Sequence, residues 1–471
     1  MFRTLHYCVL NFAIAIALLL TVPSVGQVPP PFRDTIDTIP PDWNGPVFEL
    51  SKDYPTTLTL PAGDAKPWKA FDFKTQPREY IQAIIAYARE GNEEVQWRVQ
   101  DNTSRKWYHA PGLLGAGTDS IPASGREFVH GLTRERTSPK KELHPSQDKP
   151  VSNWAVGFYN PIAALTIGKV WADPESPDTD SVQFEDGAVA FKLLFTSAPD
   201  SQVPFLANSM KWQANIDLAD PPSTTRAPHD VLLLQVDVAV RDDRNDDVTG
   251  WVFGTFMYQA DASGTDPLDR LVPVGLMWGN DLEQTWLNRD GTPPTESPHV
   301  GWRDRLNGPV DNPRSSCLSC HARAVVPYLP GVTVPRTDAD ADDPAKKFFT
   351  NTKAGDVYDG APAGSVPLDY SLQLAVGVRL FPGSAPSPAP QALIGRPPAQ
   401  TFNFRSGEPE EPVTEKANPR VAPEAAAPKA APGPAAAQEN QIDWVPWGAA
   451  GAIVIVLIFI WMRSKPHSGG A

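Results

Sequence analysis

One five-residue motif constrains this chain more than any other feature. Cys317, Cys320 and His321 form the pattern Cys-x-x-Cys-His, which occurs once in the sequence. Two thiols three positions apart can add to the two vinyl groups on one side of a porphyrin, and the next residue is then held beneath the iron, where a histidine nitrogen can bind. The motif therefore predicts one covalent haem c, attached through Cys317 and Cys320, with His321 as the proximal iron ligand.

Two other chemistries use a Cys-x-x-Cys pair. A thioredoxin-like redox pair normally follows an apolar strand, whereas Asp-Asn-Pro-Arg-Ser-Ser precedes Cys317 here. A structural zinc ion would need two further ligands, and there is no second cysteine pair, because the remaining cysteine, Cys8, lies near the N-terminus. The spacing favours haem over both.

The two ends of the chain carry targeting patterns. Residues 1–26 resemble a secretory signal, with a basic start, an apolar run and small residues before a cleavage point; an uncleaved anchor is the alternative. Residues 443–463 are predicted to be one transmembrane helix, because an apolar run is flanked by tryptophans and followed by Arg463 and Lys465. These patterns predict a single-pass type I protein of the bacterial cytoplasmic membrane, with its globular domain in the periplasm and residues 464–471 as a cytoplasmic tail.

Between the ends, composition divides the chain into three parts. Residues 27–47 are expected to form an extended arm, 48–381 the globular haem c domain, and 382–442 a linker rich in proline and alanine. Periodicity predicts a helix at 77–90, strands at 188–195, 232–240, 249–258 and 271–278, and a hairpin joining the second and third of these strands. The expected fold class is α+β: a β-rich single domain that carries the haem site, followed by a disordered linker and one C-terminal transmembrane helix.

Charge excludes one class of partner and leaves another open. The formal net charge of the 471 residues is −14, which argues against a nucleic-acid-binding protein because phosphate recognition needs a basic face. The expected partners are the membrane and an unidentified redox protein. The acidic run 338–343 lacks the glycine and glutamate of a calcium loop, and is expected to precede and cap a helix at 344–351.

The second axial ligand of the iron is the main open question. No methionine or histidine occurs between Ala322 and Trp461, so a protein-derived sixth ligand must come from residues that precede the motif. Met277, in an apolar segment that contains glycine, is the candidate distal ligand, and an ordinary core methionine is the alternative. The choice matters because methionine raises the redox potential, whereas an empty position permits substrate chemistry.

Two histidines are candidate acid–base groups. His109 follows Trp107 and Tyr108, and His130 lies in a segment that also holds three arginines. A distal histidine can move a proton during haem chemistry, and arginines can pair with haem propionates. The alternative is that both histidines are core or turn residues with a structural role.

Several segments together resemble a known group of proteins. They are WYHAP (107–111), GREFVHGLTRER (125–136), NWAVGFYN (153–160), GWVFGTF (250–256), LVPVGLMWGN (271–280) and LNGPVDNP (306–313). The chain resembles a group of bacterial proteins known only as "cytochrome c family protein", over about residues 45–385. The resemblance implies bacterial export and a single c-type haem on Cys317, Cys320 and His321, but it implies no defined substrate.

The sequence predicts electron transfer on the periplasmic face by a membrane-anchored mono-haem cytochrome. The alternative is a peroxidase-like or oxidase-like haem c oxidoreductase with an open iron position, so whether the protein is an enzyme is undecided at this point. A redox or gas sensor is a third, weaker possibility, because the predicted cytoplasmic tail is too short to transmit a signal.

Overall fold

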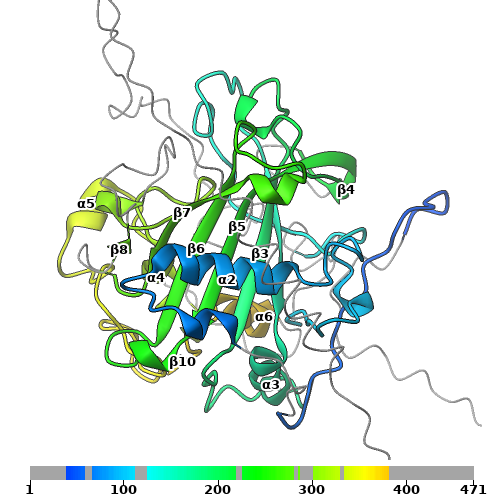
Figure 1. The fold of residues 1–471 in the computed structure, drawn as a ribbon. Helices are drawn as coiled ribbons and strands as arrows, with labels where there is room; N and C mark the ends of the chain where they lie inside the picture. The colour runs from blue at the N-terminus through cyan, green and yellow to red at the C-terminus, as the bar shows by residue number, and fades with distance from the viewer. Residues whose placement is uncertain are drawn as a thin grey trace, which may run out of the picture. The chain divides into compact units, whose positions relative to one another are not determined.

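An antiparallel sheet of eight strands is the centre of the structure, a computed structural model (Figure 1). The model describes residues 39–58, 66–111, 125–174, 176–218, 225–280, 285–286, 301–328 and 334–380, all of which belong to one compact unit. The predicted signal, linker, transmembrane segment and tail lie outside these residues, as does most of the predicted arm.

The strands of the main sheet follow the order β1-β2-β3-β5-β6-β7-β8, and β4 also pairs with β5. Their bounds are β1 Thr133–Arg134, β2 Asn153–Tyr159, β3 Val189–Thr196, β4 Lys211–Ile216, β5 Ala227–Arg241, β6 Trp251–Tyr258, β7 Leu271–Met277 and β8 Thr285–Trp286. A second, two-stranded sheet pairs β9 Val325–Val326 with β10 Val366–Pro367. The α-helices are α2 Pro77–Arg89, α3 Pro161–Val170, α4 Cys317–His321, α5 Asp338–Asp342 and α6 Leu372–Leu380. Short 3-10 turns lie at Pro67–Ala70, Val99–Asp101, Pro204–Leu206, Asp243–Asn245, Pro267–Arg270 and Trp302–Asp304.

The predicted hairpin is confirmed between β5 and β6. Their register aligns Arg241 with Trp251, and the backbone N–H of Asp242 donates to the carbonyl of Gly250 at 3.0 Å. Inside the turn, the Asp242 carboxylate accepts from the backbone N–H of Arg244, which caps a 3-10 turn. The polar run between two apolar strands therefore reverses the chain, as its composition indicates.

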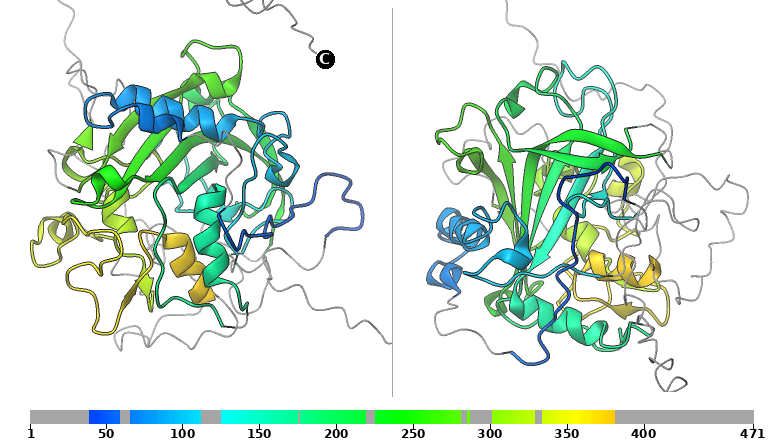
Figure 2. Two further views of the ribbon diagram at one scale, coloured as in Figure 1. Left: turned by 60° about the horizontal axis from the view of Figure 1, so that its bottom comes forward. Right: turned by 90° about the vertical axis from the view of Figure 1, so that its right-hand side faces the viewer.

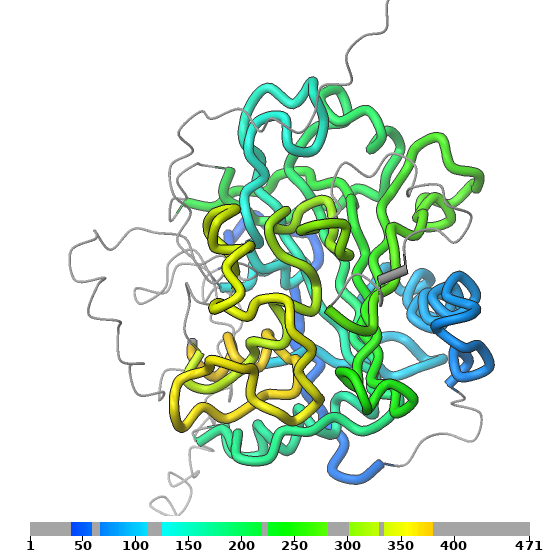
Figure 3. The backbone as a smooth tube through the Cα atoms, turned by 90° about the vertical axis from the view of Figure 1, so that its left-hand side faces the viewer, coloured from blue at the N-terminus to red at the C-terminus, as the bar shows by residue number. Residues whose placement is uncertain are grey.

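Both faces of the sheet are covered, which explains why its central strands are largely apolar. All eight residues of β6 are buried. Figure 2 and Figure 3 show α2 on one side of the sheet and α6, with the segments around it, on the other. On the first side α2 packs closely, because a Cβ on Gly254 would lie 2.5 Å from Ile81 Cδ1. The strands of a sheet that is buried on both faces have nearly continuous apolar sequences. Alternation of polar and apolar residues therefore does not show which face of the sheet a side chain lies on.

The predicted fold class is wrong. The sequence indicated an α+β, β-rich single domain with a C-terminal transmembrane helix, but the described parts of the chain are β-rich with few helices, of which the longest has 13 residues. Within those same parts, no helix is long and apolar enough to cross a membrane. The eight-stranded sheet is accompanied mainly by loops and short helices, which are too few for an α+β fold.

The local predictions had mixed outcomes. The helix at 77–90 is confirmed as α2, and the four predicted strands correspond to β3, β5, β6 and β7. The helix predicted at 344–351 is wrong, because the acidic run itself forms the helix, as α5. Thr337 caps α5 by accepting from the backbone N–H of Asp340, and aspartates in the first turn interact favourably with the helix dipole.

Candidate functional site

The Cys-x-x-Cys-His motif forms the short helix α4. Ser316 starts the helix with a capping box: its hydroxyl accepts from the backbone N–H of Ser319 at 3.0 Å, and the Ser319 hydroxyl accepts from the backbone N–H of Ser316 at 2.8 Å. Residues three and four positions apart on a helix share one face, so Cys317, Cys320 and His321 lie together. Neither cysteine forms a disulfide bond, and both are buried.

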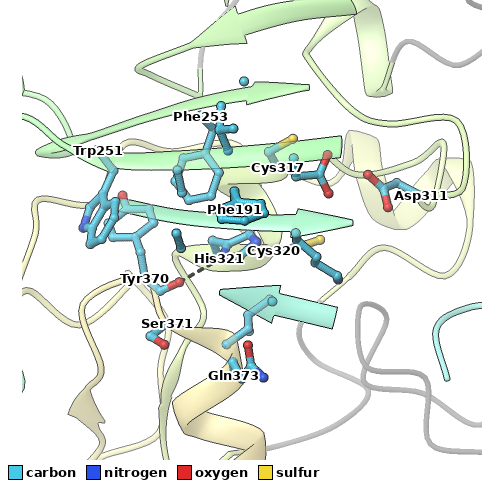
Figure 4. Close-up of a pocket in the computed structure, with 18 of the residues that line it drawn as sticks. Phe191, Trp251, Phe253, Asp311, Cys317, Cys320, His321, Tyr370, Ser371 and Gln373 are labelled. Atoms are coloured by element: carbon cyan, nitrogen blue, oxygen red, sulfur yellow. Dashed lines mark hydrogen bonds between the residues drawn. The ribbon is translucent and has the colours of Figure 1, made fainter. Parts of the chain in front are cut away.

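This face of α4 borders a cavity that is open to solvent. Ligand sites are commonly lined mainly by apolar and aromatic groups with a few polar ones. The lining combines α4, the sheet and the start of α6, as Figure 4 shows. The sequence therefore brings its two thiols and one histidine to the edge of a cavity with this kind of lining.

Small side chains on the sheet create much of this space. The register aligns Tyr159 of β2, Ala190 of β3, Ala239 of β5 and Phe253 of β6 in one row across four strands, and all four line the cavity. The two alanines in the middle leave a depression between the aromatic residues at either end. The wall of the cavity is therefore lower at the two alanines than at the aromatic residues on either side.

A charged row runs beside the apolar one. Lys192 of β3 lies opposite Asp237 of β5, and both line the cavity. Lys192 also forms an ion pair with the buried Glu135 at 2.6 Å, while Asp237 accepts from Thr255 Oγ1 at 2.9 Å. The charge of Lys192 is thus paired with Glu135, and the Asp237 carboxylate is hydrogen-bonded within the wall.

The imidazole of His321 is oriented by a backbone carbonyl. His321 Nδ1 lies 2.8 Å from the carbonyl oxygen of Tyr370, and its ring packs against Phe253 with 4.7 Å between the ring centroids (Figure 4). A carbonyl can only accept, so Nδ1 carries the proton and donates it. Nε2 is therefore the nitrogen with a lone pair for binding a metal, in the tautomer typical of metal-bound histidines.

Tyrosines near His321 remain neutral. Burial, followed by the nearby Asp369, raises the pKa of Tyr370 far above its ordinary value. Burial likewise raises the pKa of Tyr159, whose hydroxyl donates to Gln373 Oε1 at 2.6 Å. Both phenols are therefore protonated near neutral pH and can act as hydrogen-bond donors.

The structure places the candidate distal methionine beside this site but not in its wall. Met277 of β7 is fully buried, and its register partner on β6 is Phe253. It packs in the same apolar cluster as Cys317 and Cys320, yet it is not among the residues that line the cavity. Within the described part of the chain, His321 is the only histidine or methionine in the lining.

The two candidate acid–base histidines lie elsewhere. His109 accepts a hydrogen bond from the backbone N–H of Ser51 at 3.0 Å and packs against Phe158; burial, and then the charge of Arg126, lower its pKa well below the ordinary value. His130 stacks on Trp212, and burial lowers its pKa to about 4. Neither histidine lines the cavity, and sequence proximity to aromatic or arginine residues does not reveal this.

Several residues of the cavity wall escaped the sequence analysis. Lys192 and Asp237 each interrupt an otherwise apolar strand, and such an interruption is a usable signal for a functional wall. Tyr370 gives no comparable signal, because it contributes a backbone carbonyl, which any residue has.

No protein family model, curated protein or solved structure matches the chain in the comparisons with known proteins.

Proposed function

We propose that this chain is a mono-haem c-type oxidoreductase, in which one haem is bound through thioether bonds to Cys317 and Cys320 and its iron is bound by His321 with the sixth position open. The observation that carries this proposal is the arrangement of α4. Two buried thiols that form no disulfide bond, and one histidine whose Nδ1 proton is held by a carbonyl, share one edge of a cavity.

The residues present fit a haem group. The cavity has the apolar, aromatic lining of a cofactor site, and the thiols are not joined to each other. The main rival chemistry for the pair, thiol–disulfide exchange, requires an accessible thiolate, whereas both thiols are buried. When bound, haem c supplies one-electron chemistry at an iron centre.

The wall of the cavity favours an open iron position over a closed one. His321 is its only histidine or methionine within the described residues, and those are the side chains that usually complete a six-coordinate electron carrier. The chain instead offers Tyr159, Gln373 and the Lys192–Asp237 pair, which can hydrogen-bond to a small polar ligand. Periplasmic localisation belongs to the same proposal and depends on the signal predicted at 1–26.

Production of the full chain in a host that matures haem c tests the attachment. We expect a haem signal that survives denaturing electrophoresis in the wild type and disappears in Cys317→Ala/Cys320→Ala. A Ser146→Ala variant, at an exposed turn, is the matched control and should retain full haem content. A wild type without covalent haem would show that the proposal is wrong.

Carbon monoxide distinguishes the open site from an electron carrier. We expect the reduced protein to bind carbon monoxide with a shift of its absorption maximum. We expect Met277→Leu to give the same two spectra as the wild type, one without and one with carbon monoxide. A reduced spectrum that carbon monoxide does not move would instead indicate a six-coordinate electron-transfer cytochrome. If Met277→Leu then responded to carbon monoxide, Met277 would be identified as the sixth ligand.

A further inference from the structure

The hydrogen bond that orients His321 depends on an unusual backbone conformation. The carbonyl that accepts from His321 Nδ1 belongs to Tyr370, which has a φ of +67°, and the preceding residue, Asp369, has a φ of +45°. Two successive residues with side chains in the left-handed region are strained. Such a conformation persists only where surrounding contacts impose it.

The side chain of Asp369 supplies the first of these contacts. The residue is 2 % exposed, and both of its carboxylate oxygens accept hydrogen bonds. Oδ2 accepts from the backbone N–H of Phe184 at 2.7 Å, and Oδ1 accepts from the indole Nε1–H of Trp251 at 3.0 Å. The carboxylate thus joins the strained segment to a loop and to the main sheet at once.

The anchor on the sheet side is rigid. Trp251 is the first residue of β6, and its backbone carbonyl accepts from Asn245 Nδ2 and Thr249 Oγ1, both at 3.0 Å. Its ring is part of the cavity wall and packs edge-on against Phe184. A second contact holds the other side of the segment, where the Tyr370 hydroxyl donates to the carbonyl of Thr352.

Asp369 is a buried carboxylate on the residue that precedes Tyr370, whose carbonyl accepts from His321. Burial raises the pKa of Asp369, although its hydrogen-bond donors and the charge of Arg241 oppose that shift. An ordinary loop could be tied down by an amide or a hydroxyl. A buried carboxylate is a costly choice for a purely structural contact, since charge must be removed from water.

We infer that Asp369 and Trp251 are positioning residues for His321: through the Tyr370 carbonyl they fix the Nδ1 hydrogen bond and so set how strongly the imidazole donates electrons to iron. This inference rests on the proposed function. A firm hydrogen bond from Nδ1 makes the imidazole a stronger base, which stabilises oxidised iron and lowers the redox potential. Asp369 does not line the cavity and acts on His321 through the backbone, whereas Trp251 gives its indole N–H to Asp369 and its ring to the cavity wall.

Two substitutions test the inference in the haem-loaded full chain. In Asp369→Asn, the amide can accept from only one of the two N–H groups, so the segment loses one tether. In Trp251→Phe, the aromatic packing stays and only the indole donor is removed. We expect both variants to retain covalent haem, to raise the midpoint potential, and to lower the frequency of the iron–histidine stretching band in the resonance Raman spectrum of the reduced protein.

Matched substitutions elsewhere control for a general loss of packing. Glu127→Gln replaces another buried carboxylate that accepts backbone N–H groups, including those of Val129 and His130, and Trp154→Phe removes an indole donor to Ser152 Oγ at 3.0 Å. Neither residue lines the cavity. We expect both controls to lower the melting temperature without moving the potential or the Raman band.

The outcomes separate this inference from the proposed function. Covalent haem in the wild type, with the same potential and Raman band in Asp369→Asn, Trp251→Phe and the two controls, would overturn the inference and leave the haem proposal standing. A wild type without covalent haem would overturn both. If Asp369→Asn fails to fold, Trp251→Phe alone decides the question.

Discussion

At the scale of single residues, two small side chains leave room for the cavity. Ala190 and Ala239 face each other on neighbouring strands at the floor of the cavity. Any larger residue at either position would project into space that the proposed haem needs. Position 190 therefore offers a way to remove the prosthetic group without touching its covalent attachment.

We expect Ala190→Leu to abolish most covalent haem while the chain stays folded. Large substitutions in a packed core cost about 1–3 kcal/mol, but here the added atoms enter a cavity, so the haem-free chain should be at least as stable as the wild-type haem-free chain. Haem content per mole of protein and thermal unfolding followed by circular dichroism measure the two effects. Ala86→Leu, at an exposed position of α2, is the control and should keep its haem. Full haem content in Ala190→Leu would contradict the assigned cavity.

His130 makes stability depend on pH. Its pKa is lowered by burial from 6.5 to about 4, so between these values the unfolded chain binds a proton that the folded chain does not. Stability therefore falls as pH falls from about 6.5 to about 4, by at most ~3 kcal/mol for this residue. Urea unfolding at pH 7 and pH 4.5 should show a smaller difference for His130→Phe, which keeps a ring against Trp212. His109 also has a lowered pKa, so some loss of stability at pH 4.5 should remain in His130→Phe. The prediction would be contradicted if the variant lost as much stability between pH 7 and pH 4.5 as the wild type.

At the scale of secondary-structure elements, α4 is too short to be stable alone. It has five residues, and its capping box and the contact from Ser316 Oγ to Asn280 Oδ1 at 2.7 Å hold its start. Isolated helices shorter than ~12 residues are marginal in water. The geometry of the two thiols therefore depends on the residue that precedes the motif.

We expect Ser316→Ala to cost about 0.5–2 kcal/mol, as for other N-cap losses, and also to reduce haem attachment several-fold. Thr337→Ala removes the equivalent cap from α5 and should cost a similar amount without affecting haem content. Equilibrium unfolding and haem stoichiometry, measured on both variants, distinguish the two roles. Equal haem content in the two variants would mean that the cap of α4 does not position the thiols.

The elements also show where sequence reasoning succeeds and fails. Local patterns were sufficient for α2 and for the β5–β6 hairpin, because amphipathic spacing and a polar turn depend on neighbours in sequence. The pattern failed for α5, where a cap and aspartates in the first turn outweighed low helix propensity. The residues that hold Tyr370 in place come from segments up to 185 positions away, as Phe184 and Asp369 illustrate. No local signal connects them.

At the scale of the whole molecule, the cavity leaves side chains of the sheet, of α4 and of the start of α6 facing open space. Groups that line a void lose dispersion contacts on that side. A bound haem would restore those contacts, so its presence should be measurable as global stability.

We expect wild-type protein produced with haem maturation to melt several degrees above the same chain produced without it. For domains of roughly this size, each kcal/mol changes the melting temperature by ~2–4 °C. Calorimetry on the two preparations checks the prediction, and because the sequence is identical no substitution complicates the comparison. Equal melting temperatures would indicate that the prosthetic group makes few contacts with the cavity wall.

The central sheet also acts as a partition. It keeps apart an aliphatic and aromatic layer under α2 and a second layer around α4 and α6. Substitutions more than about 7–10 Å apart without shared partners usually add independently, so changes on the two sides should rarely interact. Substitutions on the α2 side can therefore be used first to raise the free energy of unfolding. Destabilising changes on the side that holds the Cys-x-x-Cys-His motif can then be tolerated.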